Sequence, residues 1–409
     1  MSIFVSLFYW LSRPFIRAQI IADDEVLKAQ SIDPNKPISY VLLTDSFTDK
    51  LALEQVCRKQ NLPSPFSRLK MGAQKFKRTL GVKTVKSVFQ PENAHVTKTI
   101  AWGQQLLKQV EDSDQDVQFV PVMICWGRAP GIERTDNKIG LWDLLAATLR
   151  TTPLRKFFIV LFAGRHNMVR ISQPVSLQYM VDKYGSTEDT AHKLLRVARI
   201  HFERQRLVAT GPKTMARQAF FNSMLASPAL KKALQEEMKS KNISLEQAKK
   251  NANKLLDEIA GDYNETYIRF GSRVLTWVWN KIYNGIRVHN ADKLRDLAQK
   301  GHEIVYVPCH RSHMDYLLLT YVIYHEGLVP PRIAAGINLN FWPAGPFFRK
   351  AGAFFLRRSF KGNKLYSAVF REYLSQLFIK GYPVKYYTEG GRSRTGRLLA
   401  PKTGMLAMT

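Results

Sequence analysis

A histidine and an aspartate five residues apart form the pair in this sequence best suited to catalysis. His310 and Asp315 lie in the segment PCHRSHMDY, which follows a predicted strand and opens a predicted helix. This spacing lets Asp315 accept from one imidazole nitrogen, leaving the other nitrogen as a general base for a hydroxyl. There is a structural alternative, because Ser312 and Asp315 have capping-box spacing and Asp315 would then bond free backbone N–H groups. His313 is a surface or core histidine in either case.

Two glycine-flanked basic segments follow this pair. Residues 340–409 contain thirteen basic and two acidic residues, and the basic side chains gather in GAFFLRRSFKG (352–362) and EGGRSRTGR (389–397). Glycine lets the backbone approach a ligand closely, and arginine binds phosphate through two parallel hydrogen bonds. The combination indicates chemistry on a phosphorylated alcohol. The alternative is a basic loop that contacts lipid or nucleic acid. Glu389 would either anchor the loop by an ion pair or hold a substrate hydroxyl.

Three motifs, HRSHMD, GAFFLRR and EGGRSRTG, resemble in order and spacing three motif blocks of the glycerol-3-phosphate acyltransferases. The resemblance is specific over about 303–402, and the residues before it are consistent with the long N-terminal region of the bacterial membrane-bound members. It implies that His310 is the catalytic base and that Asp315 orients it. It also implies a substrate-binding set in the second and third blocks: Phe355, Leu356, Arg358, Glu389, Gly390, Arg392, Ser393 and Arg394.

The resemblance implies direct acyl transfer from acyl-acyl carrier protein or acyl-CoA to the sn-1 hydroxyl of glycerol-3-phosphate. No covalent acyl-enzyme is needed, and the chemistry requires no cofactor and no metal. The third block reads YTEGG rather than the FPEGT form, which argues against lysophosphatidate as the acceptor. Dihydroxyacetone phosphate or another acceptor stays open. From another class, the rival is a non-catalytic basic protein that binds a polyanion, although no nucleic-acid-binding signature is present.

The elements that would position these residues alternate between strand and helix. Strands are predicted at 303–309, 332–336 and 384–389, and helices at 314–327 and 362–380. Alternating strands and helices indicate an α/β domain, whose ligands bind beyond the carboxyl ends of the strands. Further upstream, apolar runs predict strands at 38–43, 117–126 and 156–164, and a long helical region covers about 187–300.

Three parts are expected along the 409 residues. An N-terminal α/β region spans 1–185, a helical region 186–300, and an acyltransferase domain 301–409. The last residues, PKTGMLAMT, predict the start of an apolar helix, so we expect the acyltransferase domain to be incomplete at its C-terminus. The expected fold class is therefore α/β, with an incomplete acyltransferase domain preceded by a mostly helical region with some strands.

The charge balance points to anionic partners. Lys and Arg number 61 against 33 Asp and Glu, a net charge of +28, and residues 58–86 hold nine basic residues and no acidic one. An acidic carrier protein, a phosphorylated substrate and an anionic membrane surface all fit this balance, whereas nucleic acid is not expected. The apolar, aromatic N-terminus is either an interfacial anchor or a core helix. No run reaches membrane-spanning length. We therefore expect a peripheral or monotopic protein on the cytoplasmic face of a bacterial inner membrane.

Overall fold

The computed structural model describes residues 9–11, 14, 16, 18–20, 32–33, 35–72, 74–83, 92–113, 115–126, 167–360 and 362–409. Contacts divide the chain into two compact units, one over 1–128 and 138–206 and the other over 129–137 and 207–409. The three-part division at 185 and 300 stays a prediction. The strand predicted at 156–164 lies outside the described residues.

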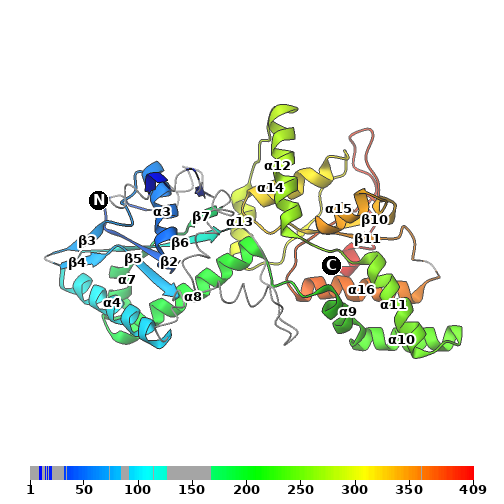
Figure 1. Cartoon of the computed structure of the whole chain (residues 1–409), viewed down its shortest axis with the longest axis horizontal. Coiled ribbons are helices and arrows are strands. Elements are labelled where there is room, and N and C mark those ends of the chain that lie inside the picture. The colour runs from blue at the N-terminus through cyan, green and yellow to red at the C-terminus, as the bar shows by residue number, and fades with distance from the viewer. Residues whose placement is uncertain are drawn as a thin grey trace. The chain divides into compact units, whose positions relative to one another are not determined.

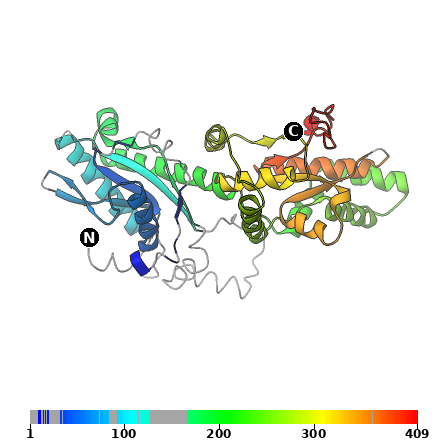
Figure 2. The same ribbon diagram turned by 90° about the horizontal axis from the view of Figure 1, so that it is seen from above.

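The first unit is built on a six-stranded sheet. Its strands follow the order β1-β7-β6-β2-β5, with β8 paired to β6, and the blue and cyan strands run side by side in Figure 2. The strands and helices of this unit are β1 (Ala18–Ile20), β2 (Ile38–Thr44), α3 (Phe47–Lys59), β3 (Arg68–Met71), β4 (Gln74–Lys77), β5 (Thr79–Lys83), α4 (Glu92–Ser113), β6 (Gln118–Trp126), β7 (Asn167–Ile171), β8 (Val175–Ser176), α7 (Leu177–Tyr184) and most of α8 (Glu188–Thr210). The strands predicted at 38–43 and 117–126 are confirmed as β2 and β6.

The basic segment near residue 70 is a β-hairpin. Strands β3 and β4 pair antiparallel, with Leu69 opposite Phe76. These two side chains are buried, whereas the basic residues that alternate with them, such as Lys70 and Lys75, are exposed. The alternation follows from the two-residue period of a strand, which places neighbouring side chains on opposite faces. The hairpin therefore presents a row of cations to solvent.

The second unit carries a four-stranded parallel sheet in the order β11-β10-β12-β9. Its elements are α9 (Arg217–Leu225), α10 (Pro228–Lys241), α11 (Leu245–Ile259), α12 (Glu265–Lys281), α13 (Ala291–Gln299), β9 (Val305–Tyr306), α14 (Asp315–His325), β10 (Arg332–Gly336), η3 (Ile337–Leu339), α15 (Ala344–Lys350), β11 (Ala353–Leu356), α16 (Lys364–Ile379), β12 (Val384–Lys385) and η4 (Leu406–Met408). The α/β class predicted from the sequence is confirmed.

Both faces of this sheet are covered, with α16 on one side and α15 on the other (Figure 1). Side chains alternate along the strands accordingly. Phe354 joins the core formed with α9, α10, α11 and α16, whereas Ala353 and Phe355 join the core formed with α15. A parallel sheet needs cover on both faces because its strands are apolar throughout. With both faces covered, ligands can reach the sheet at the ends of its strands, which are called here its amino edge and its carboxyl edge.

Local signals mark the ends of helices α10 and α11. Ser244 accepts a hydrogen bond from Gln247 N and begins α11. Asn242 ends α10 in the left-handed conformation, at a φ of 53°. Asparagine tolerates this conformation better than other residues with a side chain. None of the helices among the described residues is both long and apolar enough to cross a membrane.

Candidate active site

The candidate site lies at the carboxyl edge of the second unit's sheet. His310 follows β9, and the EGGRSRTG segment follows β12, which pairs with β9 in parallel register. Neighbouring parallel strands end at the same edge, so the two loops meet there. Ser393 N donates to the His310 carbonyl oxygen at 2.8 Å. The first and third motifs, about 80 residues apart in the sequence, are thus in direct contact.

The imidazole of His310 is held on both of its nitrogens. Nδ1 lies 3.2 Å from Asp315 Oδ2, and Nε2 lies 2.7 Å from the Tyr316 hydroxyl. A carboxylate only accepts, so Nδ1 carries the proton, and the neutral ring then accepts from Tyr316 at Nε2. The ring also packs on Tyr387, with centroids 4.3 Å apart. This tautomer leaves on Nε2 the lone pair that a general base needs.

Asp315 does both of the things that its spacing predicts. Its Oδ2 contacts His310 and also accepts from the backbone amides of Arg311 and Ser312, each at 2.7 Å. Burial by itself raises the pKa of Asp315, but the two amides and His310 outweigh burial and hold that pKa below its usual value. The carboxylate therefore stays ionised and ties the histidine loop to the start of α14. His313 is exposed and makes none of these contacts.

The second motif is divided between core and surface. Phe355 is fully buried, under the guanidinium of Arg349 at 4.7 Å from its ring, and Leu356 is half-buried beside it. Arg357 makes two hydrogen bonds to the carboxylate of Glu258, at 2.7 and 2.6 Å. Arg358 is exposed. Of the two adjacent arginines, the one at the family's motif position thus points to solvent, beyond the carboxyl end of β11.

The third motif contains buried polar atoms without partners. Glu389 and Ser393 are 8% and 6% exposed. Within the described part of the chain, no hydrogen bond reaches Glu389 Oε2, Ser393 Oγ or the Tyr387 hydroxyl. Buried polar groups nearly always have partners, so a cluster of unpaired ones at a strand end indicates a ligand site. Arg392 and Arg394 are exposed in the same loop.

Gly390 gives this loop its path. Its φ is 62°, and a Cβ there would lie 2.9 Å from the Lys402 side chain. The positive φ favours glycine at this position, whereas the flexible end of the Lys402 side chain could move away from a Cβ. The Lys402 backbone amide also donates to the Thr388 carbonyl oxygen at 2.7 Å, which ties the two ends of the loop together.

An apolar cavity of about 440 Å³ adjoins the histidine loop. Helices α12, α14 and α15 and strands β10 and β11 form its walls, with Tyr267, Leu275, Leu317, Phe347 and Phe348 among the lining side chains. Tyr316 lines it too, so the residue bonded to His310 Nε2 also faces the cavity. Burial raises the pKa of Tyr316, with Arg392 opposing and Asp315 adding to the effect, so its hydroxyl keeps its proton at neutral pH.

Lys385 is a buried lysine that contacts the helix carrying Asp315 and Tyr316. It is fully buried on β12, and its Nζ donates to the Tyr316 carbonyl oxygen at 2.9 Å and to Thr320 Oγ1 at 3.0 Å. Burial lowers the pKa of Lys385 to about 7, although Asp315 opposes the shift. Sequence reasoning did not single out Tyr316, Lys385 or Tyr387. Only their adjacency to Asp315 and to the EGG motif could have drawn attention to them.

Comparisons with known proteins identify the family. Residues 4–211 match the model of the glycerol-3-phosphate acyltransferase PlsB N-terminal domain, which is about half of the chain, and residues 285–409 match the acyltransferase model. The chain belongs to the glycerol-3-phosphate acyltransferase family. The family resemblance inferred from the three motifs is therefore confirmed.

Several curated relatives of this family carry the name glycerol-3-phosphate acyltransferase. One from Pseudoalteromonas translucida is 53% identical over 404 residues, which cover 98% of this chain and 48% of the relative. One from Shewanella denitrificans is 50% identical over 410 residues, covering 100% and 50%. One from Colwellia psychrerythraea is 52% identical over 395 residues, covering 96% and 48%. The chain spans about half the length of these curated relatives.

Proposed function

We propose that this protein transfers an acyl group from acyl-acyl carrier protein or acyl-CoA to the sn-1 hydroxyl of glycerol-3-phosphate. The observation that carries the proposal is one arrangement at the sheet edge. A histidine–aspartate pair in the base-competent tautomer contacts the loop that holds unpaired buried polar atoms, and it also contacts Tyr316, which lines an apolar cavity. The relatives' name, glycerol-3-phosphate acyltransferase, supports the same reaction class.

In this mechanism His310 Nε2 takes the proton of the substrate hydroxyl. The oxygen then attacks the thioester carbonyl, and the thiol that leaves receives the proton from the imidazolium. Asp315 keeps Nδ1 protonated and stabilises the positive charge that the ring acquires. Because Nε2 accepts from Tyr316 before substrate binds, the substrate hydroxyl replaces the Tyr316 hydroxyl at that nitrogen.

The phosphate is bound by the exposed arginines at the same edge. Arg392 and Arg394 follow β12, and Arg358 follows β11, which is two strands away in the sheet. Two strand spacings amount to roughly 10 Å, a gap that arginine side chains from both loops can span toward one phosphate. Glu389 and Ser393, whose buried oxygens lack partners, take the glycerol hydroxyls. Holding the acceptor at both ends makes the attack effectively intramolecular.

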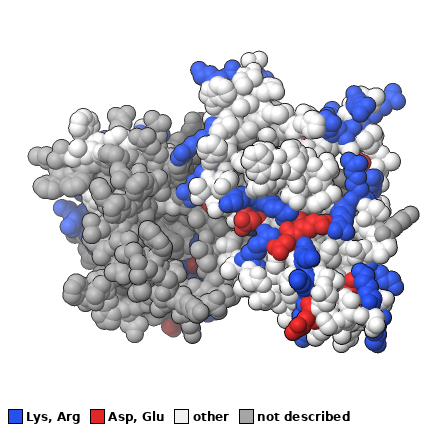
Figure 3. Space-filling view, turned by 45° about the vertical axis from the view of Figure 1, so that its right-hand side comes forward, with Lys and Arg blue, Asp and Glu red and all other residues white. Residues whose placement is uncertain are grey.

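The acyl chain of the donor occupies the apolar cavity, with its carbonyl toward Tyr316 and His310. Burial of the chain there is favourable by about 0.8 kcal/mol per CH₂ group. A basic face suits either donor, since acyl carrier protein is acidic and CoA carries phosphates. Lys and Arg cover more of the face in Figure 3 than Asp and Glu do. Dihydroxyacetone phosphate remains the alternative acceptor.

We also propose that the protein binds the cytoplasmic surface of a bacterial inner membrane. The exposed cations of the β3–β4 hairpin support this, because each basic residue near an anionic surface contributes about 1 kcal/mol. Trp10, in the described part of the predicted N-terminal anchor, is 70% exposed. Most of that anchor lies outside the described residues.

The assignment of His310 as the base is tested by replacing each of two nearby histidines with alanine in separate variants. We expect His310→Ala to reduce acyl transfer by at least roughly a hundredfold, the lower range for loss of a general base. His313→Ala is the matched control, because His313 is exposed and does not contact Asp315. Initial rates and glycerol-3-phosphate binding are measured for both. An active His310→Ala protein beside an inactive His313→Ala protein contradicts the assignment.

The non-catalytic alternative makes a different prediction for the same samples. A basic protein that only binds polyanions shows no turnover that saturates with glycerol-3-phosphate. Its binding instead falls steadily as salt increases. Rates measured against both substrates, at two salt concentrations, therefore distinguish the two functions.

A further inference from the structure

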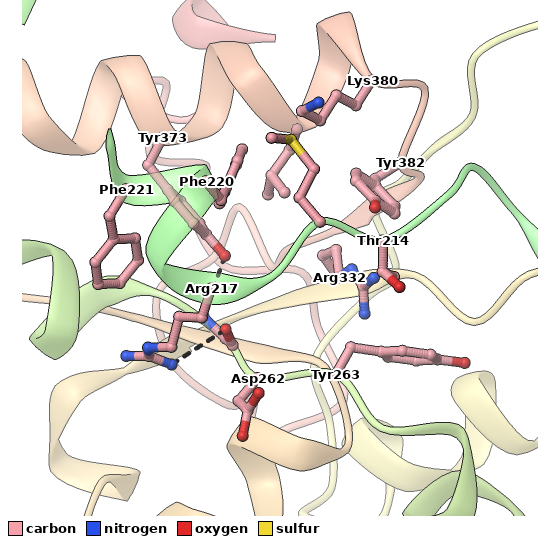
Figure 4. Close-up of a pocket in the computed structure, with 13 residues that line it drawn as sticks. Thr214, Arg217, Phe220, Phe221, Asp262, Tyr263, Arg332, Tyr373, Lys380 and Tyr382 are labelled. Atoms are coloured by element: carbon pink, nitrogen blue, oxygen red, sulfur yellow. Dashed lines mark hydrogen bonds between the residues drawn. The ribbon is translucent and has the colours of Figure 1, made fainter. Parts of the chain in front are cut away.

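A second pocket lies at the opposite, amino edge of the same sheet (Figure 4). Arg332 is the first residue of β10, and Tyr382 comes two residues before β12. All four strands are parallel, so these residues lie at the edge away from His310. The five residues of β10 alone separate the two edges by roughly 13 Å. The pocket is therefore distinct from the candidate active site.

The centre of this pocket is a buried guanidinium clamped between two rings. Arg332 Cζ lies 4.0 Å from the centroid of Tyr263 and 4.6 Å from that of Tyr382, and Figure 4 shows Arg332 between them. Stacking on both faces fixes the plane of the guanidinium, and its N–H groups lie in that plane between the two rings. The clamp is built before any ligand arrives.

The guanidinium lacks the partner that a buried cation needs. Arg332 is only 9% exposed, and its Nη1 has no hydrogen-bond partner within the described ranges. None of the ion pairs found among the described residues includes Arg332. Gly352, at a φ of 101°, leaves space beside it, since a Cβ there would lie 3.7 Å from Nη1. Burying a charge without a partner is costly, so this site favours an anion.

The rest of the lining indicates the size and charge of that anion. Arg217 and Lys380 are also in the wall, against a single lining acid, Asp262. Arg217 is paired with Asp257 at 3.1 Å, so Arg332 and Lys380 supply the excess of positive charge in the lining. The cavity is about 100 Å³, several times the ~10–15 Å³ that one water needs. A phosphate group, at about −1.5 to −2 near neutral pH, matches both the charge and the room.

We propose that Arg332, with Lys380, binds a phosphate group in this pocket. The site needs neither His310 nor the EGGRSRTG loop, so it does not depend on the proposed acyl transfer. Its occupant comes either from solution, as inorganic phosphate or a phosphate monoester, or from the headgroup of an anionic lipid. Because the two edges of the sheet are separate, a phosphate bound here does not displace one bound at the carboxyl edge.

Calorimetric titration with inorganic phosphate tests the proposal. The background is a protein carrying Arg358→Gln, Arg392→Gln and Arg394→Gln, which removes the three arginines proposed to bind the substrate phosphate. We expect one saturable site per chain in this background, weakened at least roughly tenfold by adding Arg332→Gln, since charge-assisted contacts are the strong ones. Arg371→Gln is the control, because Arg371 is exposed on α16, the helix that Lys380 follows. It should leave phosphate binding unchanged.

A second variant covers the case in which Arg332→Gln does not fold, as judged by its thermal unfolding. Lys380→Gln should then weaken phosphate binding several-fold. Titrations with glycerol-3-phosphate, and with vesicles containing phosphatidic acid, distinguish the two sources. Arg332-dependent binding of vesicles alone identifies the lipid source. Absence of saturable binding of all three probes, or equal binding by folded Arg332→Gln and its background, overturns the proposal.

Discussion

Burial of Lys385 makes the stability of the protein rise with pH, whereas a lysine whose pKa is raised by an ion pair makes stability fall with pH. Its pKa is about 7 in the fold, against 10.5 for an ordinary lysine. The charged form is therefore disfavoured in the folded state by about 5 kcal/mol, at 1.36 kcal/mol per pKa unit. Below pH 7 both states bind the proton and the penalty is fully present. Above pH 10.5 neither state binds it and the penalty is gone.

Between these limits the unfolded chain holds one more proton than the folded one. Stability then rises with pH by up to about 1.4 kcal/mol per unit. A neutral amine also suits the contacts, since its two N–H groups match the two acceptors, the Tyr316 carbonyl oxygen and Thr320 Oγ1. Lys385→Met removes the titrating group and keeps most of the volume. Relative to this variant, the wild-type protein should gain about 3 kcal/mol between pH 7 and pH 9.5.

Urea unfolding of both proteins at four pH values between 6.5 and 9.5 measures this difference. Lys232→Met is the control, because Lys232 is exposed on α10. Its difference from wild type should not change over the same range. A difference between wild type and Lys385→Met that stays constant with pH would show that Lys385 remains charged in the fold. A difference that falls with pH would require an acidic partner and refute the reasoning.

Further predictions concern the candidate site and its supports. Asp315→Asn should lower turnover by roughly a hundredfold or more, because the neutral amide cannot stabilise the imidazolium. The thermal midpoint of unfolding should change little. Unchanged turnover would leave Asp315 as a structural residue only. Tyr316→Phe should change turnover by less than about tenfold, because substrate replaces that hydroxyl at the base, and inactivity equal to that of His310→Ala would make the hydroxyl part of the chemistry. Arg357→Ala should cost about 1 kcal/mol of stability through the loss of its ion pair with Glu258. Arg358→Ala should leave stability unchanged and raise the KM for glycerol-3-phosphate about tenfold or more. Thermal unfolding and steady-state kinetics measure both effects, and the reverse pattern would exchange the roles of the two arginines.

Much of the second unit follows from local signals in the sequence. The strand at 332–336 and the helix at 362–380 were predicted within two residues of their observed bounds, Arg332–Gly336 and Lys364–Ile379. A short apolar run bounded by Pro331 and Gly336, and the capping residue Asn363 before the helix, are sufficient for this. The order of the three motifs likewise predicted the family.

The strands that carry the site are shorter than their apolar runs. The run at 303–309 forms a ladder only over Val305–Tyr306, and the run at 384–389 only over Val384–Lys385. Pro308 has no N–H to donate, so the ladder cannot continue through it. After Lys385 the chain leaves the sheet and continues into the EGGRSRTG loop. Hydropathy does not distinguish a buried strand from a buried loop that continues it.

The environment of His310 could not be predicted because it depends on tertiary packing. A lysine in a strand is ordinarily assigned to a solvent face. Here both faces of the sheet are covered, so the side chain of Lys385 has no route to water and finds its acceptors on α14 instead. It thereby ties β12 to the first turn of the helix that carries Asp315 and Tyr316. Eight residues after Lys385, the backbone amide of Ser393 ties the same segment of chain to the His310 carbonyl oxygen.

Strand β12 and its loop therefore hold the histidine loop from two sides. Lys385 bonds the backbone of Tyr316, whose hydroxyl bonds His310 Nε2, and Ser393 bonds the backbone of His310, the proposed base. The segment proposed to bind substrate is in this way also the support of the base. A substitution in the EGGRSRTG loop can consequently lower turnover without touching substrate, by displacing His310. Substrate contact and support of the base are separable, since loss of a phosphate contact raises KM, whereas displacement of His310 lowers kcat at saturating substrate.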